Sequence, residues 1–555
     1  MTDLYAKHAA LLDRAIAATA ARDYFSAYPE SASPKVYGET SKAEGDAAFE
    51  ALLGKPFSFD DRHPNERLIG AETSPYGKPL NVRYPTASVE TLVAASLAAG
   101  EAWGEASVEA RAGVLLETLA RLNRQSFLIA DAVQHTSGQS WGMAFQAGGP
   151  HAQDRALEAV AYAVAEMNRI PREARWEKPQ GKGEPIRLAK RFRVVPRGIA
   201  VEIGCATFPT WNLYPGLFAS LATGNAVIVK PHPAAILPAA ITLKVLREVL
   251  IEAGFDPNVA LLAADEASAP VAKDLVQHPA IKIVDFTGGP AFGSWLRHSL
   301  KDKLVYTEEA GVNAIVIDST SNFRGMCDNV AFSLSLYSGQ MCTAPQNIFV
   351  PKSGIESNEG RKSFDEVATA IAGAVDALLG DPGRAATVLG AIQGDATLSR
   401  VKEAERLGRV VRASAPIEGV ARSATPLILA VDAGDANAYR EERFGPISFV
   451  VATESTGDSL ARAESSIREK GAITASLYTT SEAVAEAAET AFARANVALS
   501  INLIGNIFVN QSAAFSDFHV TGGNPAGNAS LTDAAFVANR FRIAPVRRMG
   551  AGQLK

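Results

Sequence analysis

Cysteine and histidine are scarce in this chain, which limits the kinds of site that it can hold. The 555 residues include three cysteines, Cys205, Cys327 and Cys342, and eight histidines. An odd, sparse set of cysteines without a CxxC pair argues against a disulfide framework. No two histidines stand at the spacing of metal ligands, so neither a structural nor a catalytic zinc is expected.

Long apolar runs and charge of one sign are also missing. No stretch approaches the roughly 20 apolar residues that span a bilayer. The net charge is −6 and no basic stripe is present, so neither nucleic acid nor a membrane is an expected partner. The first residues alternate apolar and acidic side chains at helical spacing, unlike a secretory leader. We therefore expect a cytoplasmic protein.

What is present is the composition of an ordinary globular protein, spread over a long chain. Hydrophobic residues make up 47% and charged residues 21%. The chain is too long for one hydrophobic core, so we expect two large domains. Residues 1–60 and 88–172 are expected to be mostly helical, with Ser88 capping the second stretch and Pro171 ending it.

The middle of the chain alternates apolar strands with helical stretches such as 236–253. This order predicts a parallel, doubly wound α/β sheet with right-handed crossovers. Ligands of such sheets lie at the carboxyl ends of the strands, which places Lys230, Thr287–Gly289 and Glu308 on one rim. The expected strands are 199–203, 226–229, 259–263, 281–286 and 304–307.

A second α/β region runs from about residue 311 to 503. Its expected strands are 313–318, 347–350, 447–452 and 473–478. Residues 184–196 mix charged and β-branched side chains and are expected to form exposed strands. A Gly/Asn/Ser-rich stretch, 516–531, leads to a last expected strand at 540–547.

Three short segments could carry chemistry, although each has an ordinary structural alternative. Lys230 follows a buried strand and can meet a phosphate or ribose, but a surface lysine at a strand end is about as common. Gly288 and Gly289 precede a helix start, where backbone amides bind anions; they could equally form a tight turn. Cys342 lies among small and polar residues, as an accessible thiolate would, whereas most lone cysteines are inert.

Five motifs follow one another along the chain. They are PRGIAVEIGCATFP with LATGNAVIVKP, FTGG at 286–289, TEEAGVN with Glu308, SGQMC ending at Cys342, and EERFGP at 441–446. Together they resemble the aldehyde dehydrogenase superfamily, whose patterns are PxGV…NFP…GNxVVxKP, FTGS, a general-base glutamate, GQxC and EEIFGP. The interval between Glu308 and Cys342 is also the one that the family shows.

The resemblance implies an α/β fold with a Rossmann-type cofactor domain, an α/β catalytic domain and a small β oligomerisation element. Residues 1–183 and 197–310 would form the NAD(P)-binding domain with its N-terminal helices. Residues 311–505 would form the catalytic domain that carries the nucleophilic cysteine. Residues 184–196 and 506–555 would supply oligomerisation strands and a C-terminal tail, so a homodimer or larger homo-oligomer is expected.

The resemblance also implies a mechanism. The Cys342 thiolate would attack an aldehyde, hydride would leave to the nicotinamide, and Glu308 would serve as base toward the resulting thioester. The family's second oxyanion donor is the asparagine of NFP, and here that position is Thr207. Either Thr207 takes over this role, or nearby Asn212 does, or activity on generic aldehydes is low; the loss of such a donor typically costs about 3–4 kcal/mol.

The resemblance further implies the cofactor site. Members that prefer NAD carry a glutamate three residues after the lysine, whereas this chain has Pro233 there. Without that carboxylate Lys230 could pair with a 2′-phosphate, so we expect NADP to be preferred over NAD. Glu441 is expected to be a solvated neighbour. The expected cofactor-binding residues are Lys230, His232, Gly288, Gly289, Phe292, Glu442 and Phe444.

The substrate is expected to be a small-molecule aldehyde. The long N-terminal extension, CATFPTWN, KPHP, EEAGVN and FSDFHVTGG resemble aldehyde dehydrogenases of phenylacetic acid degradation, which implies a ring-opened, CoA-linked semialdehyde. Phe515 and Phe518 either line the aldehyde tunnel or pack in the core. Three alternatives stay open: a CoA-acylating dehydrogenase, a redox-independent acyltransferase or thioesterase using Cys342, and a non-catalytic protein that keeps the fold.

Overall fold

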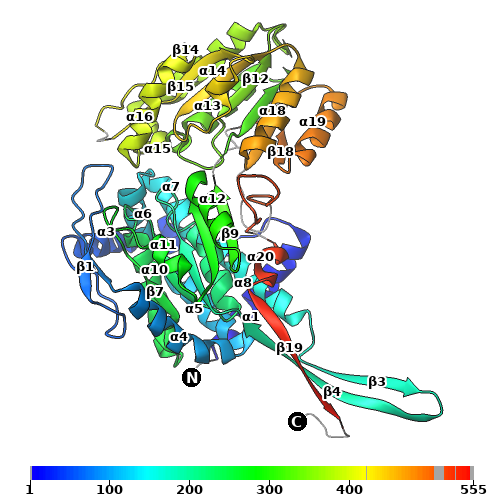
Figure 1. Cartoon of the computed structure of the whole chain (residues 1–555). Helices are drawn as coiled ribbons and strands as arrows, with labels where there is room; N and C mark the ends of the chain where they lie inside the picture. Colours follow the sequence, from blue (N-terminus) through cyan, green and yellow to red (C-terminus); the bar gives the residue numbers. More distant parts are fainter. Residues whose placement is uncertain (1–2, 310, 420–421, 506–517, 532, 550–555) are drawn as a thin grey trace.

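The computed structural model describes residues 3–309, 311–419, 422–505, 518–531 and 533–549. Figure 1 shows two lobes and a narrow arm that projects from one of them. The first lobe contains the N-terminal helices and a five-stranded sheet, and the second contains a seven-stranded sheet. Among the described residues, no helix combines the length and apolar character that crossing a membrane requires.

The five-stranded sheet of the first lobe is parallel and has the order β7-β6-β5-β8-β9. Neighbouring residues of β5 pack on opposite faces: Val201 joins the cluster on one face and Ala200 the cluster on the other. Strand β5 lies at the centre of the sheet. Strands β6 and β7 lie on one side of it, and β8 and β9, which come later in the chain, lie on the other side. All five predicted strands are confirmed, as β5 (Ile199–Ile203), β6 (Ala226–Lys230), β7 (Ala260–Leu262), β8 (Ile281–Gly288) and β9 (Leu304–Glu309).

Helices cover both faces of this sheet (Figure 1). The predicted helix at 236–253 is confirmed, and Ser88 caps the first helix of its stretch by accepting the Thr91 amide at 3.2 Å. These apolar helices form the largest core of the molecule together with the N-terminal helix α1 (Leu4–Ala21). The principal members are α4 (Val89–Glu105), α5 (Val108–Arg124), α8 (Ala152–Asn168), α9 (Leu213–Ala222) and α10 (Leu237–Glu252).

The second lobe is built on the sheet β14-β15-β16-β12-β10-β17-β18, parallel except for β14 at its edge. Four of its strands were predicted and are confirmed: β10 (Ala314–Ile317), β12 (Asn347–Pro351), β16 (Ile447–Thr453) and β17 (Thr474–Tyr478). The others are β14 (Arg409–Arg412), β15 (Leu427–Asp432) and β18 (Ala498–Ile501). Helices α13 (Phe323–Ser335) and α14 (Phe364–Leu379) pack on one face, and α18 (Thr456–Lys470) and α19 (Glu482–Arg494) on the other.

The projecting arm is an antiparallel sheet of β3 (Glu173–Gln180), β4 (Gly183–Pro196) and β19 (Phe541–Met549). Strands at 184–196 and 540–547 were expected, whereas residues 173–183 were expected to belong to the cofactor domain. They form β3 and its turn, because Gly181 supplies the positive φ of 50° that joins β3 to β4.

The segment 518–531 lies between the two lobes and ties them together. It contacts β9 through backbone pairing, since the Glu309 amide donates to the Ala526 carbonyl at 2.6 Å. On the other side, Asn524 donates to the carbonyl of Ala472 at 2.8 Å, just before β17. Farther along, Arg540 anchors the start of the arm with hydrogen bonds to Asp285 of β8. These contacts hold the C-terminal part of the chain against strands β8 and β9 of the first lobe.

Candidate active site

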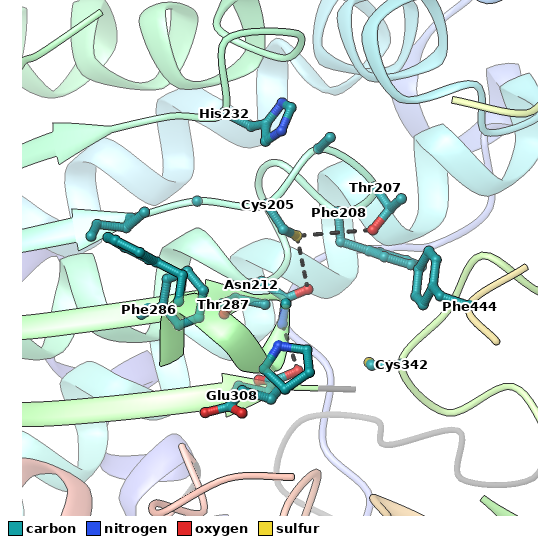
Figure 2. Close-up of a pocket in the computed structure, with 18 of the residues that line it drawn as sticks. Cys205, Thr207, Phe208, Asn212, His232, Phe286, Thr287, Glu308, Cys342 and Phe444 are labelled. Atoms are coloured by element: carbon teal, nitrogen blue, oxygen red, sulfur yellow. Dashed lines mark hydrogen bonds between the residues drawn. The ribbon is translucent and has the colours of Figure 1, made fainter. Parts of the chain in front are cut away.

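The ten residues predicted for the site all line one cavity of about 800 Å³. They come from strand ends at the carboxyl edge of the first sheet and from loops of the second lobe (Figure 2). The cavity lies where the chain order of the sheet reverses, which is where doubly wound sheets bind ligands. The ten are Thr207, Lys230, His232, Gly288, Gly289, Phe292, Glu308, Cys342, Glu442 and Phe444.

One end of the cavity presents a helix N-terminus. Strand β8 ends at Gly288, and α12 (Pro290–Ser299) begins after Gly289, its N-cap. A side chain at Gly288 would collide with the Phe286 ring, because its Cβ would lie 2.6 Å from that ring. Glycine therefore avoids a displacement of the Phe286 ring, and residues 289–292 at the start of α12 line the cavity. Such a helix start binds phosphate groups.

Lys230 has a carboxylate partner that the sequence did not reveal. Its Nζ lies 2.6 Å from Oδ1 of Asp265, which follows β7, and only 5% of Lys230 and 3% of Asp265 are exposed. The other carboxylate oxygen accepts the amide of Val271 at 3.1 Å. The expectation that NADP is preferred assumed that no carboxylate lies near Lys230. That premise is wrong, because Asp265 places a carboxylate beside Lys230 from a different part of the chain.

At the opposite end of the cavity, Glu442 and Phe444 come from the loop before β16. Burial raises the pKa of Glu442 to about 7, although the nearby Arg400 guanidinium acts in the opposite direction. Arg400 also donates to the Phe444 carbonyl at 3.0 Å and so fixes the backbone of the loop. Glu441 is exposed and pairs with Lys470 on the surface at 2.7 Å, as expected for a solvated neighbour.

The loop that carries Cys342 is held in an uncommon conformation. Tyr337, Ser338 and Gly339 have positive φ values of 51°, 50° and 62° in succession. Two non-glycine residues in this region cost free energy that surrounding contacts must offset, which is typical of functional sites. After the turn, Asn313 donates to the Cys342 carbonyl at 2.8 Å and fixes the nucleophile's backbone.

The surroundings of Cys342 disfavour the thiolate form of its side chain. Burial raises its pKa well above the usual range, and the negative charge of Glu308 raises it further, while Arg155 acts in the opposite direction. A protonated thiol is a weak nucleophile, so attack on a carbonyl requires a base to remove the proton. The site therefore needs a proton acceptor close to Sγ.

Glu308, at the end of β9, is in position to be that acceptor. Its side chain is 1% exposed, and Oε1 accepts hydrogen bonds from Asn212 and from His519, each at 2.9 Å. Burial raises the pKa of this carboxyl, but His519, Arg155 and Asn212 together outweigh burial and hold the pKa below its usual value. Among the described residues, Oε2 has no hydrogen-bond partner.

The two candidates for the oxyanion donor differ in what they contact (Figure 2). Asn212 donates its amide to Glu308, so in this structure it orients the base. The Thr207 hydroxyl lies 4.0 Å from the Sγ of Cys205, a long contact that leaves it able to donate to a ligand. The arrangement favours Thr207 for the oxyanion and Asn212 for the carboxylate.

Sequence reasoning missed His519 and Arg155. Nε2 of His519 lies 3.6 Å from Sγ of Cys342. The two residues are 177 positions apart, so no local spacing in the sequence predicts their contact. Arg155 is buried on α8 and lies 3.6 Å above the Trp211 ring, with no described hydrogen bond to its guanidinium nitrogens. One polar atom each of Glu308, Cys342 and His519 lies within 4.8 Å of the others, a proximity that no sequence motif indicated.

A second cavity of about 730 Å³ reaches Cys342 from the other side. It is lined by residues of both lobes, by His519, and by the N-terminal segment from Tyr24 to Glu30. Phe518 is not part of this lining; its ring lies under the Arg22 guanidinium at 4.2 Å, and Phe515 lies outside the described residues. Cys342 therefore lines two cavities. The start of α12 lines the first cavity but not the second.

Comparison with known proteins agrees with this geometry. The model of the aldehyde dehydrogenase family matches residues 81–523. The chain belongs to the aldehyde dehydrogenase family. The crystal structure of an NAD-dependent aldehyde dehydrogenase from Burkholderia multivorans is similar to this protein. The two sequences are 55% identical, the match covers 99% of each chain, and the TM-score is 0.97. The family and the fold expected from the ordered motifs are confirmed.

Curated relatives match over shorter stretches. A 2-aminomuconic 6-semialdehyde dehydrogenase from a Pseudomonas species is 32% identical over 46% of this chain and 51% of its own length. A 1-pyrroline-5-carboxylate dehydrogenase from Geobacillus thermodenitrificans is 25% identical over 62% of this chain and 65% of its own length. The chain therefore spans less than two thirds of these relatives, and neither carries the phenylacetate-specific role in its name.

Proposed function

We propose that this protein oxidises an aldehyde to a carboxylic acid with a nicotinamide dinucleotide, through a thioester on Cys342. The observation that supports this most directly is the position of Cys342 on the wall of both cavities. A nucleotide in the first cavity and an aldehyde in the second would meet at its Sγ. A redox-independent acyltransferase would need only the second cavity, so the first one favours a dehydrogenase.

The first cavity fits a nicotinamide dinucleotide in three respects. The start of α12 offers backbone amides to the pyrophosphate, Lys230, which is held by Asp265, reaches a ribose, and Glu442 and Phe444 line the same cavity. When bound there, the cofactor supplies the hydride acceptor. His232 and Phe292, at the cavity wall, would contact the nucleotide.

The protein's own residues account for the remaining steps. Glu308 removes the thiol proton, and the electron pair of the S–H bond forms the bond from Sγ to the aldehyde carbon. The backbone amide of Cys342 and the Thr207 hydroxyl stabilise the resulting oxyanion. After the hydride has left, Glu308 gives up the thiol proton to solvent and can act as a base again. It then takes a proton from a water molecule, whose oxygen attacks the thioester carbon; the C–S bond breaks, the acid is released, and the sulfur recovers a proton as the thiol. Water as acceptor distinguishes this reaction from CoA acylation.

The cofactor preference follows from Asp265. A 2′-phosphate that pairs with Lys230 would also lie near this carboxylate and be repelled by it, whereas an unphosphorylated ribose meets no such repulsion. We therefore propose that NAD is used in preference to NADP, the reverse of what the sequence alone predicted. The name of the Burkholderia multivorans structure agrees with this proposal.

The substrate proposal is a ring-opened, CoA-linked semialdehyde, on the basis of the subfamily resemblance. The second cavity is large enough for a long acyl group, but its described lining contains no lysine or arginine. The CoA phosphates would therefore stay outside it, with the acyl part reaching Cys342. A comparison of the CoA-linked semialdehyde with an uncharged medium-chain aldehyde tests this substrate proposal.

We also propose a homo-oligomer that forms through the arm, and a cytoplasmic location. Four large apolar side chains of the arm are exposed, which is unusual for a projecting sheet that has no partner. They are Trp176, Val195, Val546 and Met549.

The dehydrogenase proposal is tested by following reduced nicotinamide by absorbance with a medium-chain aldehyde and with the CoA-linked semialdehyde. We expect reduction with the wild-type protein, none with Cys342→Ala, and wild-type rates with Cys327→Ala, since Cys327 is packed in α13 away from both cavities. Turnover of the Cys342→Ala protein would refute the thioester mechanism. Acyl transfer without any cofactor would favour the acyltransferase alternative, and turnover that requires CoA would favour the acylating one.

A further inference from the structure

One imidazole nitrogen contacts both the nucleophile and the buried carboxylate. Nε2 of His519 lies 2.9 Å from Oε1 of Glu308 and 3.6 Å from Sγ of Cys342. All three groups lie within a small region, and His519 is only 2% exposed. None of the five motifs that carry the family resemblance includes this histidine.

We propose that His519 is a positioning residue that acts on both partners of the proton transfer. Its Nε2–H donates to Oε1 of Glu308, and together with Asn212 it fixes this oxygen, so that Oε2 is left to receive the thiol proton. Once the thiol has ionised, the same N–H stabilises the Cys342 thiolate. This role rests on the proposed function only in that Cys342 is the nucleophile.

The hydrogen bonds of Glu308 support different roles for its two carboxylate oxygens. Oε1 accepts two hydrogen bonds, whereas Oε2 is buried without one among the described residues. A buried carboxylate oxygen without a donor is costly unless the site uses it. In the transfer, the S–H bond breaks, its electron pair stays on sulfur, and an O–H bond forms on Oε2. The Nε2 proton stays on nitrogen throughout.

The surroundings of His519 hold its ring in place. The ring meets Trp211 edge to face at 4.6 Å between centroids, and Arg155 lies on Trp211 as well. The next residue, Val520, is fully buried, and the segment is tied to β9 by backbone pairing. The ring is therefore supported by packing that is independent of its contacts with Glu308 and Cys342. Within the described part of the chain, the ionisable side chains around the ring or lining its cavity are Glu308, Cys342, Arg155, Asp154, His151, Glu30 and Tyr24.

The role is tested without cofactor or aldehyde, by the pH dependence of Cys342 alkylation with iodoacetamide. Peptide mass spectrometry separates Cys342 from the other cysteines, and EDTA keeps metal off the three donors. In His519→Ala we expect the apparent pKa of alkylation to rise by about one unit and the rate near pH 7 to fall about tenfold. His519→Gln, whose amide N–H reaches a similar position, should recover most of that loss.

Two controls keep the test decisive. His298→Ala removes an exposed histidine from the far end of α12 and should leave the alkylation profile unchanged. Near-ultraviolet circular dichroism confirms that the variants are folded. A wild-type profile in His519→Ala would overturn the proposal, and equal losses in His519→Ala and His519→Gln would reduce His519 to a packing residue. If alkylation behaves as expected but no nicotinamide is reduced, only the proposed function fails.

Discussion

Replacing Asp265 by asparagine is expected to shift the cofactor preference toward NADP. In the wild-type protein, the Lys230 ammonium is neutralised by Asp265 at 2.6 Å. Asp265→Asn removes this negative charge but keeps an acceptor for the Val271 amide, which donates to Asp265 at 3.1 Å. Lys230 is then available to pair with a 2′-phosphate, and the repulsion between the phosphate and the carboxylate is gone.

The size of the shift follows from the two opposing effects. A charge-assisted hydrogen bond contributes about 1.5–3 kcal/mol, which corresponds to a factor of roughly 10–150 in affinity. Burial lowers the pKa of Lys230 and Asp265 raises it, so the variant also loses an influence that favours the charged lysine. We therefore expect the ratio of kcat/KM for NADP to that for NAD to rise by about 10–30-fold, near the lower end of that range.

Steady-state kinetics with both cofactors at one aldehyde concentration measure this ratio directly. Glu266→Gln makes the same change of charge one residue away, at a side chain with no described contact to Lys230, and should change the ratio less than about twofold. A ratio in Asp265→Asn that equals that of Glu266→Gln would refute the assignment of Asp265 to the adenosine ribose.

Three further variants test other parts of the account. Asn212→Ala removes one of the two donors to Glu308 Oε1 and should lower kcat by about 10–100-fold, with KM for the cofactor nearly unchanged. Burial raises the pKa of Glu442 to about 7, so its carboxylate ionises as pH rises from 6 to 8. The KM for the cofactor should therefore fall over that pH range in the wild type and stay constant in Glu442→Gln. Arg540→Met leaves Asp285 buried without its cation and should lower stability by about 3–5 kcal/mol, seen as an earlier urea midpoint, whereas Arg542→Met at the exposed neighbour should not.

Much of the fold could be predicted because its signals are local. The strands of both parallel sheets are short apolar runs buried on both faces, and each ends in a recognisable turn or polar residue. Strand β3 was missed because it has neither an apolar run nor a clean alternation. Most of its residues are exposed, and it is a strand only because it pairs with β4.

The site was predictable to the extent that its residues lie in motifs. All ten predicted residues line the same cavity, because the ends of adjacent parallel strands bring distant motifs together. Asp265 and His519 could not be found in this way. Asp265 lies in a segment without a motif, and the segment FSDFHVTGG, which contains His519, does not indicate what the histidine contacts. A contact between side chains so far apart in sequence depends on the packing of the whole chain. The premise behind the expected NADP preference was mistaken for the same reason, since the contact between Asp265 and Lys230 cannot be seen in the sequence.

The central claim is that Cys342 carries the substrate as a thioester after hydride has left. Rapid acid quenching of the wild-type protein with aldehyde and NAD, followed by mass spectrometry of the peptide that contains Cys342, tests this most directly. The account predicts an adduct on Cys342 with the mass of the aldehyde less two hydrogens, formed together with an equal amount of reduced nicotinamide. An adduct on another residue, or reduced nicotinamide formed without any adduct on Cys342, would contradict it.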